Sequence, residues 1–309
     1  MSDTTATARR EIIDGLAQSP ACIAPKYFYD ACGSALFEDI TRLPEYYPTR
    51  TERGIMATHG ADIARRVGAG GTVIELGAGS CEKARVLCAL LRPLRFVAVD
   101  ISAEFLDEAV AGLRAAFPAL DVRAVAADLT AAIVLATDIP RRQRLLFYPG
   151  SSIGNFDPPH ALDLLRRIRQ LLDDDGALLI GVDLVKDVSV LEAAYNDAAG
   201  VTADFNRNVL NHVNCLIGGD FDPLQWRHVA FFNAAESRIE MHLEASGDTR
   251  VCWPGGERRF AAGERIHTEN SYKWRVADFA ELLARAGFTG MHHWTDERAW
   301  FAVFLAKVR

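Results

Sequence analysis

Short apolar runs alternate with amphipathic segments through the middle of the chain, from about residue 53 to residue 185. The apolar runs, rich in branched and aromatic residues, cover residues 72–76, 95–100, 122–126, 144–148 and 177–182. Between them, hydrophobic side chains recur at helical spacing in residues 83–91, 103–117 and 160–172. Strands that alternate with helices form parallel βαβ units, so this pattern predicts a parallel sheet covered by helices.

The C-terminal part of the chain departs from this parallel pattern. Residues 277–286 form a helical segment that Gly287 ends, and two strand-like runs follow at 292–294 and 300–308. Only a short polar turn separates these runs, whereas a parallel return needs a long crossover, so we expect an antiparallel hairpin. A mostly parallel sheet that ends in such a hairpin is typical of the α/β, Rossmann-like class I methyltransferases.

The regular alternation stops between residues 186 and 274. This stretch contains a long polar segment of helical character at 189–211 and a partly alternating segment at 226–246 that predicts strands. We therefore expect two domains. A discontinuous methyltransferase core would comprise residues 51–185 and 275–309, and a smaller α+β substrate-binding domain would comprise residues 1–50 and 186–274.

Composition and charge narrow the classes of function. The 309 residues carry 41 acidic and 34 basic side chains, a formal net charge of -7, and no basic block. A nucleic-acid or anionic-membrane partner is therefore disfavoured. The sequence contains no run of about 18 apolar residues, so no membrane span is predicted. The first twenty residues lack the apolar core of a signal peptide. The six cysteines have no metal-ligand or disulfide spacing. We expect a cytoplasmic monomer without a metal.

A glycine turn follows the first predicted strand and opens a helix. In a doubly wound sheet this is where ligands bind, and the glycines at 77 and 79 allow a ligand to approach the backbone. Glu75 ends the strand and is expected to order the turn. The third glycine of a dinucleotide fingerprint is replaced by Glu82, so a pyrophosphate cradle and a nicotinamide oxidoreductase are disfavoured. The turn predicts a nucleoside site containing Glu75, Gly77 and Gly79.

Acidic residues also follow the next two predicted strands. Asp100 ends the second strand, where a carboxylate can accept both ribose hydroxyls, and Asp128 follows the third, where it can accept the adenine amino group. Each acid alone is more often a helix cap or a solvated turn. Acids at three successive strand ends of one sheet favour a nucleoside ligand instead.

The segment 147–156 follows the fourth predicted strand, where class I methyltransferases present the acceptor. Asn155 supplies an amide that can orient an amine or a carboxylate, although an asparagine after glycine is also common in Asx turns. The next residues, 157–160, resemble the DPPY loop of DNA amino-methyltransferases but lack its aromatic residue. Pro158 and Pro159 are therefore expected to begin a helix.

Several blocks together resemble the histidine-specific N-alpha-methyltransferases, which trimethylate L-histidine to hercynine in the first step of ergothioneine biosynthesis. The resemblance covers nearly the whole chain. It is carried by residues 28–30, 33–34, 36–37, 40–41, 43–50, 77–83, 148–156, 206–208 and 265–271. The blocks at 43–50 and 148–156 are far more specific than the glycine turn.

The resemblance implies a role for individual residues. The implied contacts to the methyl donor, S-adenosylmethionine, are Gly77, Lys83, Asp100, Asp128 and Leu129. Those to the substrate are Asn155 and Tyr195 at the carboxylate, Tyr29 near the amino group, Tyr46, Glu269 and Ser271 around the imidazole, and Met241 lining the pocket. A carboxylate such as Glu269 can accept a hydrogen bond from an imidazole N–H, which contributes about 1.5–3 kcal/mol.

These observations predict an S-adenosylmethionine-dependent N-methyltransferase of L-histidine, with Tyr29 and Asn155 orienting the reacting amine. Two other functions stay open at this point. A methyltransferase of the same fold that acts on another amino acid or an aromatic amine would keep the donor residues but is expected to lack the pair Glu269 and Ser271. A non-catalytic nucleoside-binding module would need neither the Asn155 segment nor the tyrosines.

Overall fold

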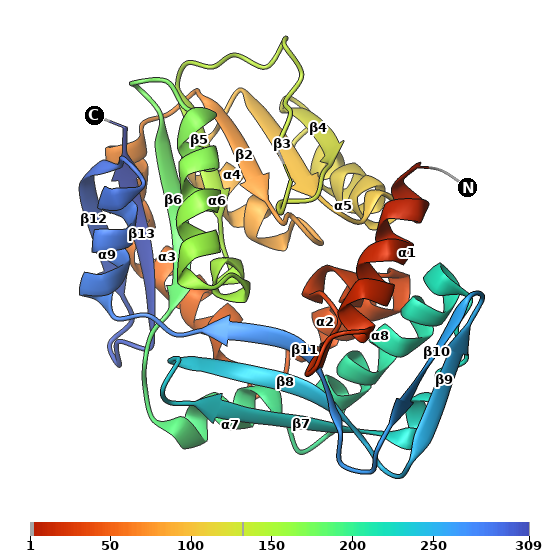
Figure 1. Ribbon diagram of the computed structural model, residues 1–309. Helices are drawn as coiled ribbons and strands as arrows, with labels where there is room; N and C mark the ends of the chain where they lie inside the picture. The colour runs from red at the N-terminus through yellow and green to blue at the C-terminus, as the bar shows by residue number, and fades with distance from the viewer. Residues whose placement is uncertain (1–2, 132, 309) are drawn as a thin grey trace. The chain divides into compact units, whose positions relative to one another are not determined.

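The computed structural model describes residues 3–131 and 133–308 and divides the chain into two compact units (Figure 1). The sheet unit comprises Tyr47–Lys186 and Tyr272–Arg309, and the insert unit comprises Met1–Tyr46 and Asp187–Ser271. Compared with the expected domains, the first boundary lies four residues earlier, because residues 47–50 already belong to helix α3 (Tyr47–Val67). The other two boundaries differ by one to three residues.

The sheet unit is built on seven strands in the order β12-β13-β6-β5-β2-β3-β4. Five neighbouring strands are parallel, namely β4 (Asp121–Ala126), β3 (Arg95–Asp100), β2 (Thr72–Leu76), β5 (Arg144–Tyr148) and β6 (Ala177–Asp183). Strand β13 (Phe301–Lys307) runs antiparallel to β6, and β12 (Thr289–Thr295) runs antiparallel to β13. The predicted class I methyltransferase sheet with its C-terminal hairpin is confirmed.

Helices cover both faces of this sheet, so its central strands are apolar on both sides. Every residue of β2, β5 and β6 is buried. On one face the strands pack against α3, α4 (Glu82–Leu91) and α5 (Ala103–Ala116). On the other face they pack against α6 (Pro158–Gln170) and α9 (Val276–Arg285). Because both faces are covered, these strands are mostly hydrophobic, and their charged residues, Glu75, Arg144 and Asp183, are buried as well.

The order of the strands reverses beside β2. From β2 the chain builds outward through β3 and β4, then returns to the other side of β2 and builds outward through β5 and β6. The loops that follow β2 and β5 therefore diverge from neighbouring strand ends. Such a switch point is where open α/β sheets bind their ligands.

The insert unit contains a four-stranded sheet in the order β1-β11-β8-β7. Its strands are β1 (Ala21–Cys22), β11 (Arg265–Tyr272), β8 (Arg238–Ala245) and β7 (Trp226–Asn233). A separate antiparallel pair is formed by β9 (Thr249–Trp253) and β10 (Gly256–Phe260). The helices of this unit are α1 (Asp3–Leu16), α2 (Ala31–Ile40), α7 (Val188–Tyr195) and α8 (Val201–Ile217).

The prediction of one long helical segment at 189–211 is wrong, because the structure breaks it into α7 and α8. Gly200 adopts a φ of +77°, in the left-handed region that favours glycine. The carboxylate of Asp197 accepts hydrogen bonds from the N–H groups of Val201 and Thr202 at 2.9 and 2.8 Å. These bonds satisfy the first backbone donors of α8, so a new helix begins there.

A buried ionic network lies at the carboxyl end of β6. The Asp183 carboxylate accepts a hydrogen bond from the Tyr47 hydroxyl at 2.6 Å and pairs with the ammonium groups of Lys186 and Lys273. Burial raises the pKa of Asp183, but the two lysines outweigh burial and hold it below its ordinary value. Burial lowers the pKa of Lys186 to about 8. Two buried cations thus depend on one carboxylate.

Within residues 3–131 and 133–308, none of the helices has both the length and the apolar character needed to cross a membrane.

Replacing Asp183 with Asn should lower the free energy of unfolding by about 3–5 kcal/mol, because two buried ammonium groups lose their counter-charge. Because the folded-state pKa of Asp183 lies below its unfolded value, this contribution is complete above about pH 5 and declines as the pH falls. Urea titrations of both proteins at several pH values measure the difference.

The matched control is Lys186→Met, which leaves the Asp183–Lys273 pair and the Tyr47 hydrogen bond in place. It should cost clearly less stability than Asp183→Asn. Equal losses in the two variants would contradict the view that the single carboxylate holds the network together.

Candidate donor and substrate sites

The glycine turn after β2 has the open backbone that the sequence predicts. The N–H groups of Gly77 and Ala78 donate to the carbonyl of Val99 on the neighbouring strand, at 2.8 and 3.1 Å. Gly77 and Gly79 adopt φ values of +68° and +49°, and a Cβ added at either would meet no described heavy atom within 4 Å. Conformation rather than crowding therefore requires glycine here, and the space beside both residues is open.

Asp100, the last residue of the neighbouring strand β3, is hydrogen-bonded to this turn. Its Oδ2 accepts a hydrogen bond from the N–H of Gly79 at 2.9 Å, and its Oδ1 accepts one from Ser102 at 3.1 Å. The side chain is half-buried, and a carboxylate has lone pairs for two further donors. It can therefore accept the hydroxyls of a ribose while it holds the turn.

Asp128 and Leu129 lie in the loop that follows β4. Oδ1 of Asp128 accepts hydrogen bonds from the backbone and the hydroxyl of Thr130, at 2.8 and 2.6 Å, so Asp128 also orders its own turn. The carbonyl of Leu129 accepts a hydrogen bond from the Arg167 guanidinium of α6 at 3.0 Å. The loop is thus fixed by α6, which sequence reasoning had not identified.

Glu75 is a buried acid near the end of β2, and only 1% of its surface is exposed. Burial raises its pKa well above the ordinary value, Lys83 opposes that shift, and Glu52 and Asp100 add to it. In the described part of the chain, its Oε2 has no hydrogen-bond partner. Burial therefore favours the protonated form of this carboxyl beside the glycine turn.

Lys83, in the first turn of α4, pairs with a residue that sequence reasoning missed. Its Nζ lies 2.7 Å from Oε2 of Glu52 on α3, and one third of the lysine side chain remains exposed. The ammonium group therefore has a buried counter-charge on one side and solvent on the other. Such a cation fits the carboxylate of an amino-acid-like donor.

Asn155 ends a short 3-10 helix, Ser152–Asn155, in the loop after β5, and is half-buried. Ser151 opens this turn with a φ of +59°, and its hydroxyl accepts a hydrogen bond from the N–H of Asp183 at 2.9 Å. Helix α6 begins at Pro158, as predicted, with the Asp157 carboxylate accepting a hydrogen bond from the N–H of His160. The loop that carries Asn155 is therefore anchored at both ends.

The insert unit brings the predicted substrate tyrosines into one aromatic cluster. The Tyr195 hydroxyl and Oγ of Ser271 lie 2.7 Å apart, both buried, and the Tyr195 ring packs edge-on against Tyr46. Phe37 packs edge-on against both Tyr46 and Tyr29, with ring centroids 6.3 and 5.8 Å away. Phe37 was not predicted as a site residue, although it lies in one of the matching sequence blocks.

Glu269 and Met241 lie on the neighbouring strands β11 and β8 and are both buried. Thr268, beside Glu269, donates its hydroxyl to the carbonyl of Met241 at 3.0 Å and also to Oδ1 of Asn206. Asn206 in turn donates to the carbonyl of His242 at 3.0 Å. The asparagine of the 206–208 block therefore fixes the strands that carry the predicted imidazole contacts.

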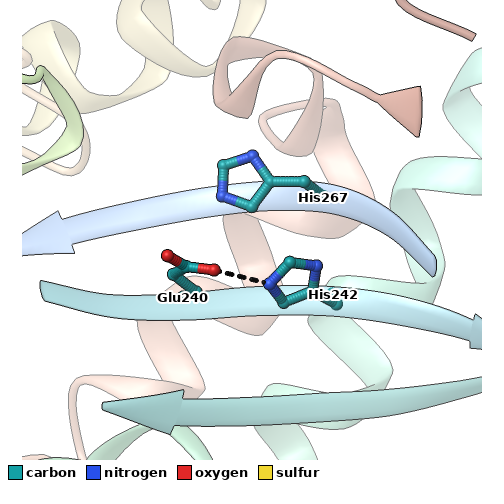
Figure 2. Close-up of side chains that lie close together, drawn as sticks. All are labelled: Glu240, His242 and His267. Atoms are coloured by element: carbon teal, nitrogen blue, oxygen red, sulfur yellow. Dashed lines mark hydrogen bonds and ion pairs between the residues drawn. The ribbon is translucent and has the colours of Figure 1, made fainter. Parts of the chain in front are cut away.

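One group in the described part of the chain has metal-ligating atoms within 4.8 Å of one another: Glu240, His242 and His267 (Figure 2). Burial favours a higher pKa for Glu240, but hydrogen bonds from Asn233, Arg238 and His242 outweigh it and lower the pKa to about 2. Burial lowers the pKa of both histidines. Each histidine is therefore neutral at physiological pH.

We assign no metal to this group, because the guanidinium of Arg238 already occupies the Glu240 carboxylate. A ligating histidine also donates its other ring N–H to an acceptor, whereas Nδ1 of His242 is buried without a hydrogen-bond partner among the described residues.

Comparison with known proteins identifies the family. The family described as "Histidine-specific methyltransferase, SAM-dependent" matches residues 8–308. The chain is 43% identical to the histidine N-alpha-methyltransferase of Mycolicibacterium smegmatis, over 99% of this chain and 96% of that protein. It is 29% identical to ergothioneine biosynthesis protein 1 of Neurospora crassa, over 96% of this chain and 34% of that protein.

Among solved structures, an S-adenosylmethionine-dependent methyltransferase from Clostridium acetobutylicum matches 90% of this chain and 99% of its own, with a TM-score of 0.51 and 12% identity. This likeness concerns the fold alone. Together the family match and the sheet confirm the predicted resemblance, the enzyme class and the co-substrate, S-adenosylmethionine. The chain belongs to the histidine-specific, S-adenosylmethionine-dependent methyltransferases.

Proposed function

We propose that this enzyme transfers three methyl groups from S-adenosylmethionine to the α-amino nitrogen of L-histidine, giving hercynine for ergothioneine biosynthesis. The observation that carries the substrate assignment is on β11, where a buried carboxylate, Glu269, lies two residues from Ser271 and its hydrogen-bonded partner Tyr195. A buried acid of this kind suits a ligand with a hydrogen-bond donor on a ring, as imidazole has.

The donor would be held by residues of the sheet unit. We assign the nucleoside to the turn at Gly77 and Gly79, with Asp100 at the ribose, and the methionine carboxylate to Lys83. Support comes from the open backbone of the turn, the half-buried Asp100 and the partly exposed ammonium group. Further assigned contacts to the donor are Glu75, Asp128 and Leu129. When bound, S-adenosylmethionine supplies an electrophilic methyl group on sulfur.

The acceptor assignments follow the chemistry of histidine. Glu269 would accept the imidazole N–H, Ser271 and Tyr46 would complete the imidazole site, and Met241 would line it. Asn155 and Tyr195 would hold the substrate carboxylate. Tyr29 would lie near the amino group. The buried hydrogen bond between Tyr195 and Ser271 supports this proposal because it fixes both hydroxyls before substrate binds.

Each transfer is an in-line displacement: the nitrogen lone pair forms the new N–C bond while the C–S bond breaks and its electrons stay on sulfur. The substrate ammonium must therefore release one proton before each step. In this proposal Tyr29 and Asn155 align the amine, and the proton leaves through the Tyr29 hydroxyl or through water. Alignment supplies most of the acceleration. After three rounds the nitrogen is quaternary and has no lone pair, so the reaction stops.

Incubating the purified protein with S-adenosylmethionine and each proteinogenic amino acid in turn tests the substrate directly. We expect mass spectrometry to show a gain of three methyl groups with histidine alone. Trimethylation of a different amino acid or of an aromatic amine would replace the substrate assignment. Absence of transfer to any amino acid or amine would favour a non-catalytic nucleoside-binding module.

Replacing Glu269 with Ala should weaken histidine binding by about 10- to 150-fold, since a charge-assisted hydrogen bond is lost, and leave donor affinity nearly unchanged. Calorimetric titration with each ligand separates the two effects. Glu264→Gln is a suitable control, because Glu264 precedes β11 and pairs with Arg258 at 2.7 Å. Undiminished histidine binding in Glu269→Ala would refute the imidazole assignment.

Replacing Tyr29 with Phe should slow methylation and shift the products toward mono- and dimethylhistidine, because the amine loses a hydroxyl that orients it. Quantifying the three products over time measures the change. Tyr27→Phe serves as the control, since the Tyr27 hydroxyl contacts the carboxylate of Glu11 at 3.1 Å. An unaltered rate and product distribution in Tyr29→Phe would remove Tyr29 from the mechanism.

The remaining expectations belong to the same proposal. The substrate is a small molecule, and we propose a monomer that binds neither nucleic acid nor membranes. A cytoplasmic location would suit the unpaired thiols of its six cysteines.

A further inference from the structure

Glu52 is a buried acid on α3 that none of the assignments above uses. Only 3% of the residue is exposed. A buried carboxylate is costly unless it is paired and hydrogen-bonded, so its partners explain why it is tolerated. These partners lie in two separate segments of the sheet unit, one after β2 and one after β5.

The first partner is Lys83, whose Nζ lies 2.7 Å from Oε2 of Glu52. The second is the backbone N–H of Gly150, which lies 3.0 Å from each oxygen of the same carboxylate. Lys83 follows the glycine turn of the donor site, and Gly150 begins the loop that leads to Asn155. One side chain therefore binds the segments that diverge at the switch point of the sheet.

Two glycines make room for this arrangement. A Cβ at Gly150 would lie 2.8 Å from Nζ of Lys83, and the residue has a φ of +78°. A Cβ at Gly181, inside strand β6, would lie 2.0 Å from Oε1 of Glu52. A glycine in a buried strand lacks side-chain packing, and it often marks a place where another group approaches closely. Here the approaching group is the Glu52 carboxylate.

The ion pair between Glu52 and Lys83 also affects a third residue, Glu75. Glu52 and Asp100 both lie close enough to Glu75 to raise its pKa, so three acids interact with one another here. Lys83 is the cation that opposes the effect of burial on Glu75. Its ammonium group, held by Glu52 and one third exposed, is kept at a fixed place near the turn.

We propose that Glu52 is a positioning residue that couples the two halves of the reaction: it holds Lys83 toward the methyl donor and holds the Gly150 backbone, and with it the Asn155 loop, toward the acceptor. The inference rests on the proposed donor and acceptor assignments. It gives Glu52 no direct contact with either substrate.

Two substitutions of similar size separate the two arms. In Glu52→Gln the amide oxygen can still accept the Gly150 N–H, but the charge that holds Lys83 is gone. We expect the Kd for S-adenosylmethionine to rise about tenfold while the KM for histidine stays near the wild-type value. In Glu52→Met both contacts are lost, so both constants should rise. Calorimetry without histidine gives the first constant, and steady-state methylation gives the second.

Asp62→Asn is the matched control, because Asp62 lies on the same helix and pairs with Arg65 and Arg66. It should change neither constant. If Glu52→Met does not fold, Glu52→Gln still tests the donor arm through the Kd for S-adenosylmethionine. If Glu52 has a purely structural role, its variants should have lower thermal stability, and Glu52→Gln should not change the Kd for S-adenosylmethionine more than the KM for histidine.

Wild-type donor affinity and histidine KM in both Glu52 variants would overturn the inference, as would equal effects of Glu52→Gln on both constants. This failure is distinguishable from failure of the proposed function. If wild-type protein does not methylate histidine, the proposed function fails, while the donor arm is still read from the Kd for S-adenosylmethionine.

Discussion

The reversal of strand order beside β2 is the constraint on which the proposed donor site depends. Because β3 and β4 extend the sheet on one side and β5 and β6 on the other, the loops after β2 and β5 must part at their strand ends. The glycine turn, Asp100 and the Asn155 loop all take their places from this geometry. The hydrogen bonds of Gly77 and Ala78 to Val99 then fix the turn against the neighbouring strand.

Buried charge accompanies this geometry. Glu52, Glu75 and Asp183 are all buried acids in the same unit. The free-energy cost of burying the carboxylate is offset differently at each of them. Asp183 pairs with two lysines, Glu52 pairs with one lysine and accepts a backbone N–H, and burial raises the pKa of Glu75, which favours its neutral form. A buried acid is therefore compatible with a stable unit where neighbouring groups pair with its charge or where burial favours its neutral form.

Much of the architecture can be predicted from the sequence because strands covered on both faces are mostly apolar, as in β5 and β6. The break before α8 was missed because Asp197 and Gly200 interrupt a polar stretch whose spacing stays helical. Glu52 was missed because an acid on an amphipathic helix resembles a solvated residue. The one local signal was Gly181, a glycine inside an apolar strand, which only the structure connects with Glu52.

The pairing of β13 with β6 also bears on how the protein is made. Residues 187–271 separate the two segments of the sheet unit, so β6 leaves the ribosome well before its antiparallel partner. At typical synthesis rates roughly 6–25 seconds pass between the synthesis of Asp183 and that of Lys307, and in this time the mostly apolar β6 is a sheet edge without its partner. The nascent chain is thus most prone to aggregate in this interval, and chaperone demand should concentrate there.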